Sequence, residues 1–479
     1  METSKTRIAR HHLIGLGFWQ AWQMVVLCTE VIVTPEADQQ GLTLAIILAT
    51  TVGYLVIMAA SRFTDLVLKS RAAIPMAAAS MSGGTFILML ASAIPDPSLS
   101  IVALAVALIA VSYGNAALLF MWGELWSTLA TGRVGRHLYL SYAFAFIPFF
   151  LCYFLPYPAG GVLCCLFPIA SCVILVSCAS EPRRKPSSTP FALDRTLAAK
   201  AICFIILLSI IWGSTQHIVP QLFSSNETSE FIALSMLVAG VALGAFALSL
   251  MLSSPESETA ALYRPIVPCM AIGMTTFFLF PGSWSFIGNG LLTIGIYCLD
   301  MLIMLASTDI AFRARIASPL AFGIALVSSR IGTFLGSFAV YMLPLPLVEA
   351  APFDRTFITV AMLSLAILVI AGMIVFTQAD LQSLYVSPYS PEASEPPAHD
   401  TSTTTQRCQI VAEAAGLTAR ETEVLELLVR GRTVQGLCEE LSIAQGTAKH
   451  HVSNIYRKLG VGDRRSVFDI VERAKPSNE

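Results

Sequence analysis

The residues best suited to chemistry lie on one face of a predicted helix near the C-terminus, over 444–459. Its apolar residues recur at spacings of four, three and four, which is typical of a helix with one buried face. These apolar residues are Ala448, Val452, Ile455 and Leu459. The opposite face consists of Thr447, Lys449, His450, Ser453, Asn454, Arg457 and Lys458. Residues 449–465 have five Lys or Arg against one Asp, a net charge of +4, which favours an anionic partner.

Neighbouring helices must hold this face in place. Thr418 and Glu421 have the spacing of a capping box, so we expect a helix that begins after Thr418 and ends at Gly431. A second helix is predicted over 433–441, and a fourth, over 464–473, closes the unit. The sequence therefore predicts a small four-helix domain over 413–479.

This domain closely resembles the LuxR-type helix-turn-helix domain. The segments LTARETEVLELLVRG (417–431) and GTAKHHVSNIYRKLGV (446–461) follow the first-helix and recognition-helix patterns of that family. The resemblance implies that the third helix enters the major groove of DNA, with Lys449, His450 and Ser453 facing the bases. It also implies phosphate contacts from the remaining polar residues of the face, namely Thr447, Asn454, Arg457 and Lys458.

The charge of residues 413–479 bears on how such a domain binds. It has ten basic and ten acidic residues, so it is polarised rather than basic overall. A single copy neutralises few phosphates, and we expect a homodimer formed through this domain on an inverted-repeat operator in double-stranded DNA. RNA polymerase is a further partner that a transcription regulator would meet.

The segment before this domain is predicted to be a flexible linker, over 380–412. It contains a stretch with four prolines, a Ser/Thr run and almost no large aliphatic residues (385–406), which cannot form a core.

Residues 1–379 have a different composition. The whole chain is 55% hydrophobic and only 13% charged, and residues 1–379 hold 18 Lys or Arg and 17 Asp or Glu. A membrane-spanning helix needs roughly 20 apolar residues. Twelve spans are predicted, over 12–33, 41–60, 72–93, 100–122, 138–155, 159–179, 200–219, 230–252, 265–281, 286–307, 318–343 and 357–377. The predicted fold class is all-α, a polytopic bundle of about twelve helices in the lipid bilayer followed by the four-helix domain.

The loops predict the orientation of this bundle. With the N-terminus inside, the inner loops contain sixteen Lys or Arg residues and the outer loops contain only Arg355. Lys and Arg accumulate on the cytoplasmic side of membrane proteins. We therefore expect a multi-pass protein of the bacterial inner (plasma) membrane with both termini in the cytoplasm.

The arrangement of the spans resembles the major facilitator superfamily. A long basic connection, 181–200, separates six spans from six. The loop SRFTDLVLKSR (61–71) is similar to that family's inner loop, and Asp65 and Lys69 occupy the positions of the family's acid and base. The resemblance implies a 6+6 transporter-like fold with a central cavity.

Polar residues inside the spans are candidates for ligand binding or helix pairing, because their burial in lipid is costly. These residues are Glu30, His217, Asp300, Arg330 and Gln20. We expect an Asp300–Arg330 pair, which either holds helices together or binds a ligand. Asp309 is expected to pair with Arg313, one turn further along the helix.

Together these features predict a one-component transcription regulator embedded in the membrane, whose transporter-like domain senses an unknown small-molecule ligand. The alternative is a secondary transporter with a regulatory C-terminal tail. Enzymatic activity is not expected, because the sequence has no phosphate loop, metal cluster or nucleophile constellation, and we expect no cofactor and no bound metal.

Overall fold

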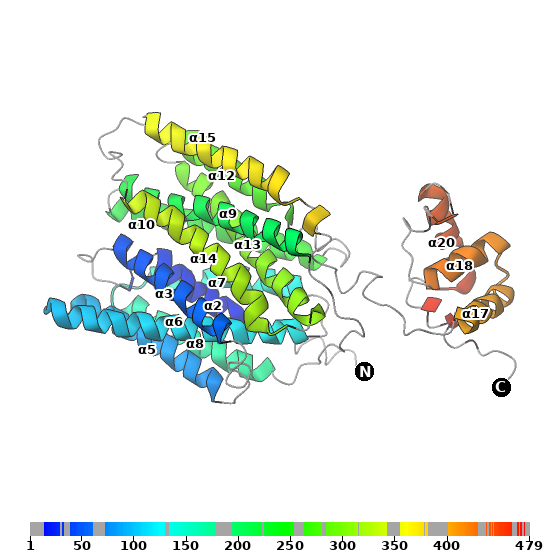
Figure 1. The fold of residues 1–479 in the computed structure, drawn as a ribbon, viewed down its shortest axis with the longest axis horizontal. Helices are drawn as coiled ribbons and strands as arrows, with labels where there is room; N and C mark the ends of the chain where they lie inside the picture. The colour runs from blue at the N-terminus through cyan, green and yellow to red at the C-terminus, as the bar shows by residue number, and fades with distance from the viewer. Residues whose placement is uncertain are drawn as a thin grey trace. The chain divides into compact units, whose positions relative to one another are not determined.

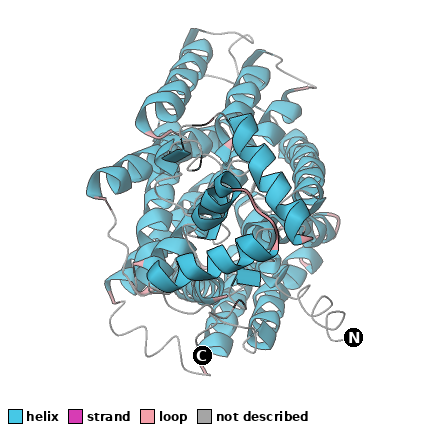
Figure 2. Ribbon diagram, turned by 90° about the vertical axis from the view of Figure 1, so that its right-hand side faces the viewer, coloured by secondary structure: helices cyan, strands magenta, loops and turns pink. Residues whose placement is uncertain are grey.

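The computed structural model of the chain divides into two compact units, residues 1–385 and 386–479, which are described separately below. The residues that it describes are 14–28, 31–32, 39–60, 72–129, 134–178, 194–222, 225–252, 263–279, 284–314, 316–342, 355–377, 379–381, 401–429, 437, 440–441, 443, 445–461, 467–468, 470–471 and 474. Helices and loops make up these residues, with no strand among them (Figure 2).

The first unit is a bundle of long apolar helices (Figure 1). Its first six are α2 (Leu16–Cys28), α3 (Gln39–Ala59), α5 (Ala73–Ala93), α6 (Pro97–Thr128), α7 (Val134–Tyr153) and α8 (Ala159–Ser177). The next six are α9 (Arg195–Leu222), α10 (Ser225–Leu252), α12 (Ile266–Leu279), α13 (Ser285–Arg313), α14 (Ser318–Met342) and α15 (Arg355–Ile370). A π-helical turn, η4 (Ala371–Val375), continues α15.

These helices match the predicted spans one for one, so the predicted polytopic all-α fold is confirmed. Among the described residues, nine helices are long and apolar enough to cross a membrane, and three shorter apolar helices accompany them. The shorter ones are Leu16–Cys28, Ile266–Phe277 and Met362–Val375, each within a predicted span. The match arises because unbroken apolar length is a local property of the chain.

Each set of six helices packs mainly within itself, and the two sets meet through a few central helices. α5 packs on α6 and α8, and α9 packs on α14. The two sets meet where α14 packs on α3 and where α10 packs on α7. α13 is the most enclosed of the long helices, because 89% of its most apolar 18-residue stretch is buried inside the protein. Figure 1 shows α12 and α15 on one side of the bundle and α5 and α8 on the other.

The second unit contains α17 (Thr401–Ala414), α18 (Ala419–Val429) and α20 (Gln445–Leu459). Positive φ angles at Gly416 (62°) and Gly460 (66°) end α17 and α20, as is usual for glycine beyond a helix C-terminus. Its core includes the predicted apolar stripe of α20, with Ala448 and Ile455 fully buried and Val452 and Leu459 partly buried.

Helix α17 corrects the predicted linker. Residues 380–412 were expected to be flexible, yet α17 occupies the last part of that segment, and Cys408 and Val411 are buried in the core of the second unit. Two apolar residues one turn apart sufficed for this burial, whereas the prediction considered only the polar composition around them. The predicted helices 433–441 and 464–473 lie largely outside the described residues, although Leu437, Val467 and Val471 belong to the core.

Candidate functional site

The second unit presents the first candidate site, a polar helical surface supported by a capping box. The Glu421 carboxylate accepts hydrogen bonds from the Thr418 backbone N–H (2.8 Å) and hydroxyl (3.0 Å), and the Glu421 N–H donates to Thr418 Oγ (3.3 Å). This reciprocal pair confirms the predicted start of α18. It also fixes the orientation of α18, on which α20 packs.

Helix α20 presents the predicted polar face to solvent. Thr447, His450, Ser453 and Arg457 are exposed, Asn454 is partly buried, and the Arg457 guanidinium donates to Asn454 Oδ1 at 3.2 Å. Because the apolar stripe is buried on the other side, these side chains share one accessible face. Lys449 lies in α20, and its side chain is outside the described set.

Lys458 has a role that the sequence did not indicate. Its ammonium group lies 2.7 Å from Glu421 Oε2 and 3.0 Å from the Gly416 carbonyl oxygen. This hydrogen bond from Lys458, together with those from Thr418, lowers the pKa of Glu421 to about 2. Lys458 therefore ties the C-terminal end of α20 to the N-terminal end of α18, although sequence reasoning placed it among the phosphate contacts.

Arg420 is a second structural residue that sequence reasoning missed. It donates to the Leu441 carbonyl oxygen at 2.8 Å and forms an ion pair with Glu423. The only local signal was the i, i+3 spacing of Arg420 and Glu423.

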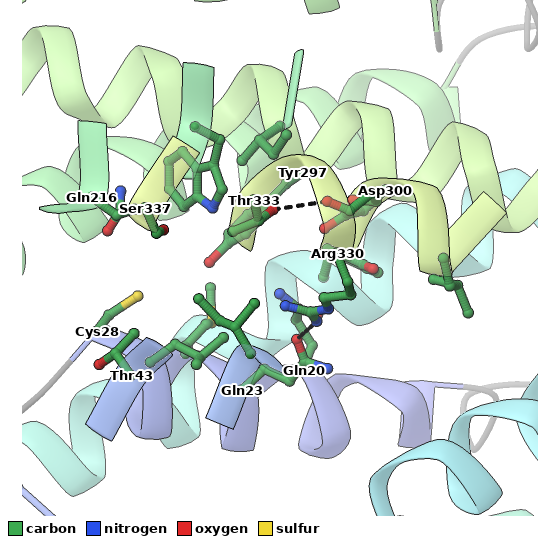
Figure 3. A pocket seen from close by; sticks show the side chains of 18 of the residues that line it. Gln20, Gln23, Cys28, Thr43, Gln216, Tyr297, Asp300, Arg330, Thr333 and Ser337 are labelled. Carbon is green, nitrogen blue, oxygen red and sulfur yellow. Dashed lines mark hydrogen bonds between the residues drawn. The ribbon is translucent and has the colours of Figure 1, made fainter. Parts of the chain in front are cut away.

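The membrane unit presents the second candidate site, a cavity of about 80 Å³. A cavity needs roughly 10–15 Å³ to hold one water molecule, so this one is large enough for more than one water or for a small ligand. Its wall comes from both six-helix sets, with residues of α2, α3 and α7 facing residues of α9, α13 and α14 (Figure 3).

A hydrogen-bond network joins the two sets at this cavity. The Arg330 guanidinium of α14 donates to Gln23 Oε1 of α2 (Figure 3). Gln23 and Trp19 donate in turn to Asn115 Oδ1 of α6, at 3.3 Å and 2.9 Å. Asn115 Nδ2 donates to the Tyr54 hydroxyl of α3 at 2.9 Å. A side chain of the second set is thereby anchored to three helices of the first.

The structure brings Asp300 and Arg330 to the same cavity but corrects their predicted direct pairing. The two charges interact electrostatically. Within the described residues, however, no ion pair of 4.0 Å or less joins them, and the Arg330 guanidinium donates to Gln23 instead. The prediction compared only depths along the spans, and the depth of a residue does not determine the direction in which a long side chain extends.

The other polar candidates fall into three groups. Gln20 and His217 are buried and line the cavity. Asp309 lies 3.1 Å from Arg313, as predicted. Glu30 and the loop 61–71 lie outside the described residues. In the described part of the chain, no group of three or more His, Cys, Asp or Glu side chains has an arrangement that could hold a metal ion.

Comparison with known families agrees with the predicted C-terminal resemblance. Residues 415–471 match the model of the bacterial regulatory proteins of the luxR family. The chain is 48% identical over 48 residues to the spore germination protein GerE of Bacillus subtilis (strain 168), covering 10% of this chain and 65% of GerE. It is 44% identical over 66 residues to the transcriptional regulatory protein DesR of the same organism, covering 14% of this chain and 32% of DesR. The chain thus spans less than two thirds of either relative.

The membrane unit resembles solved transporter structures. A bacterial homologue of the iron transporter ferroportin in the outward-facing state, with soaked iron, aligns with a TM-score of 0.51 and 15% identity over 79% of this chain and 98% of that one. The Major Facilitator Superfamily transporter FucP in the outward conformation aligns with a TM-score of 0.46 and 12% identity over 78% and 98%. At 15% identity the ferroportin homologue shows a shared transporter-like fold, as predicted.

Proposed function

We propose that this chain is a one-component transcription regulator of the bacterial inner membrane, in which a transporter-like sensor controls a LuxR-type DNA-binding unit. The observation that carries the proposal is the exposed polar face of α20, which lies within the segment matched by the luxR family model. In helix-turn-helix proteins the recognition helix lies in the major groove, and a face of hydroxyl, imidazole and guanidinium groups suits bases and phosphates.

In this proposal Lys449, His450 and Ser453 face the bases, and Thr447, Asn454 and Arg457 contact phosphates. Lys458 contributes chiefly by holding α20 on α18, because its ammonium group is already engaged by Glu421. The balanced charge of residues 413–479 supports binding as a homodimer to an inverted repeat. RNA polymerase is the partner through which a DNA-bound regulator would act.

The membrane unit supplies the input. Its cavity is lined by helices of both six-helix sets. A ligand that binds one arrangement of the two sets more tightly than another shifts the protein towards that arrangement. The Lys and Arg distribution of the loops supports cytoplasmic termini, which place the C-terminal unit on the side of the membrane where the DNA lies. The luxR match favours this regulator over a secondary transporter with a regulatory tail.

The test is the selection of random DNA duplexes by the full-length protein in detergent. The proposal predicts enrichment of an inverted repeat and loss of this enrichment in Lys449→Ala plus Arg457→Ala, with insertion into the membrane unchanged. Equal enrichment by the double variant would refute the assignment of α20 as the recognition helix. Failure of the wild-type protein to enrich any sequence would refute the regulator itself.

A further inference from the structure

The membrane cavity has one acidic and one basic side chain near each other on its wall. Asp300 of α13 and Arg330 of α14 both line it, and Figure 3 shows them at one end, with Gln216 and Ser337 at the other. The guanidinium has five N–H donors, and its bond to Gln23 uses only part of them. Both charges therefore border the cavity without a direct bond between them in the described structure.

The balance of charge restricts what can enter. Asp300 and Arg330 together are neutral, so an anion or a cation would add an uncompensated charge to a cavity with many apolar and aromatic side chains on its wall. Uncompensated buried charge is costly, whereas charged groups that meet hydrogen-bonding partners of opposite sign are favoured. A zwitterion satisfies both charges at once, because its carboxylate meets Arg330 and its ammonium group meets Asp300.

The rest of the wall suits a small ligand with an apolar part. Trp19, Trp212 and Tyr297 provide aromatic surface, and Met24, Ile47 and Leu326 provide aliphatic surface. At the far end, the Gln216 amide nitrogen is buried and finds no acceptor among the described residues. A buried donor of this kind is usually explained by a water or ligand acceptor beside it.

We propose that the cavity binds a small zwitterion of the α-amino-acid type, with its carboxylate on Arg330 and its ammonium group on Asp300. The proposal rests on the sensing role given to the membrane unit above, and it names the ligand class of that sensor. A ligand held between α13 and α14 also lies beside the Arg330–Gln23 bond between the two six-helix sets, where its binding can alter their arrangement.

The experiment is isothermal titration calorimetry of the full-length protein in detergent with each of the twenty L-α-amino acids. Each amino acid that binds is then compared with its methyl ester, which lacks the carboxylate, and its N-acetyl derivative, which lacks the ammonium group. We expect at least one amino acid to bind, and both derivatives to bind about tenfold or more weakly, because each loses a charge-assisted hydrogen bond.

Two variants test the assignment of each charge. Asp300→Asn should weaken binding of the amino acid while the N-acetyl derivative keeps its wild-type affinity or gains. Arg330→Gln should likewise weaken binding of the amino acid, while the methyl ester keeps its wild-type affinity or binds more tightly. Retained binding of one derivative by each variant also shows that the variant is folded. The matched control is Asp309→Asn, which removes the same charge from the same helix away from the cavity wall and should leave amino acid affinity unchanged.

The proposal is overturned if none of the twenty amino acids binds, or if the derivatives bind as tightly as the amino acid itself. It is also overturned if both variants lose affinity equally for the amino acid, its methyl ester and its N-acetyl derivative. None of these outcomes involves DNA. A protein that binds an amino acid with the expected pattern but enriches no duplex would refute the regulator while leaving the cavity assignment intact.

Discussion

At the scale of single residues, Glu421 connects α18 to α20, the helix that we propose binds DNA. Its carboxylate is buried and accepts hydrogen bonds from Thr418 and Lys458, which joins the start of α18 to the end of α20. Its pKa lies near 2 in the folded unit, below the ordinary value of 4.5. The ionised form therefore stabilises the fold at any pH above the unfolded pKa.

This shift predicts a pH dependence of stability. The contribution of Glu421 to the free energy of unfolding is complete above about pH 4.5 and decreases as the pH falls towards 2, because the folded pKa is the lower one. Glu421→Gln should lower the free energy of unfolding by about 1–2 kcal/mol at neutral pH. The free energy of unfolding of this variant should also depend less on pH between about pH 4.5 and pH 2. Denaturation of residues 386–479, followed by circular dichroism at several pH values, measures both effects.

Glu423→Gln is the matched control for this measurement. Its carboxylate is exposed and pairs with Arg420 three residues away. Exposed pairs contribute less than about 1 kcal/mol. An effect as large as that of Glu421→Gln would contradict the role given to the buried carboxylate.

Arg457 and Lys458 are adjacent basic residues for which the structure predicts different effects. Arg457 is exposed on the polar face, so Arg457→Ala should weaken binding to all DNA sequences and reduce the salt dependence of binding by about one phosphate contact. Lys458→Met should mainly lower stability, with a smaller change in that salt dependence, because its ammonium group is held by Glu421. DNA titrations at several salt concentrations separate the two, and equal salt slopes for both variants would argue against the distinction.

At the scale of elements, α9 and α14 approach so closely that side chains cannot fit between their backbones. A Cβ atom at Gly336 would lie 2.1 Å from the Ile210 carbonyl oxygen. These two helices also supply Trp212 and Arg330 to the same side of the cavity. Close backbone approach at small residues is a common way to pack membrane helices.

Gly336→Ala should therefore destabilise the membrane unit by about 1–3 kcal/mol, because backbone atoms would have to move. The matched control is Gly244→Ala in α10, where the added Cβ meets no atom within 4 Å. Thermal denaturation of the full-length variants in detergent compares the two. A lower midpoint for Gly244→Ala than for Gly336→Ala would show that this crossing is not tightly packed.

At the scale of the whole molecule, the proposal requires the C-terminal unit to reach DNA in the cytoplasm. The distribution of Lys and Arg predicts that the N-terminus, the 181–200 connection and the C-terminus share the cytoplasmic side, and that the loop 344–356 lies outside. Green fluorescent protein fused to the C-terminus should fluoresce, and alkaline phosphatase inserted into 344–356 should be active in cells. An active phosphatase fused to the C-terminus would reverse the orientation and exclude the proposed function.

The sequence determined the helices of the membrane unit and, in the second unit, α18 and α20. Helix length, the apolar stripe of α20 and the capping box at Thr418 depend on residues close together in the chain, so local patterns predicted them well. The luxR resemblance was visible for the same reason, because its motifs are two continuous segments.

Only the tertiary structure decided which side chains meet. It joined Arg330 to Gln23 rather than directly to Asp300, placed Lys458 against Glu421, and added Cys408 of α17 to the core of the second unit. Each of these depends on the rotation and separation of helices that are distant in sequence. Residue spacing within one helix carries no information about the neighbouring helix, and a long side chain bonds to whichever group the packing brings within reach.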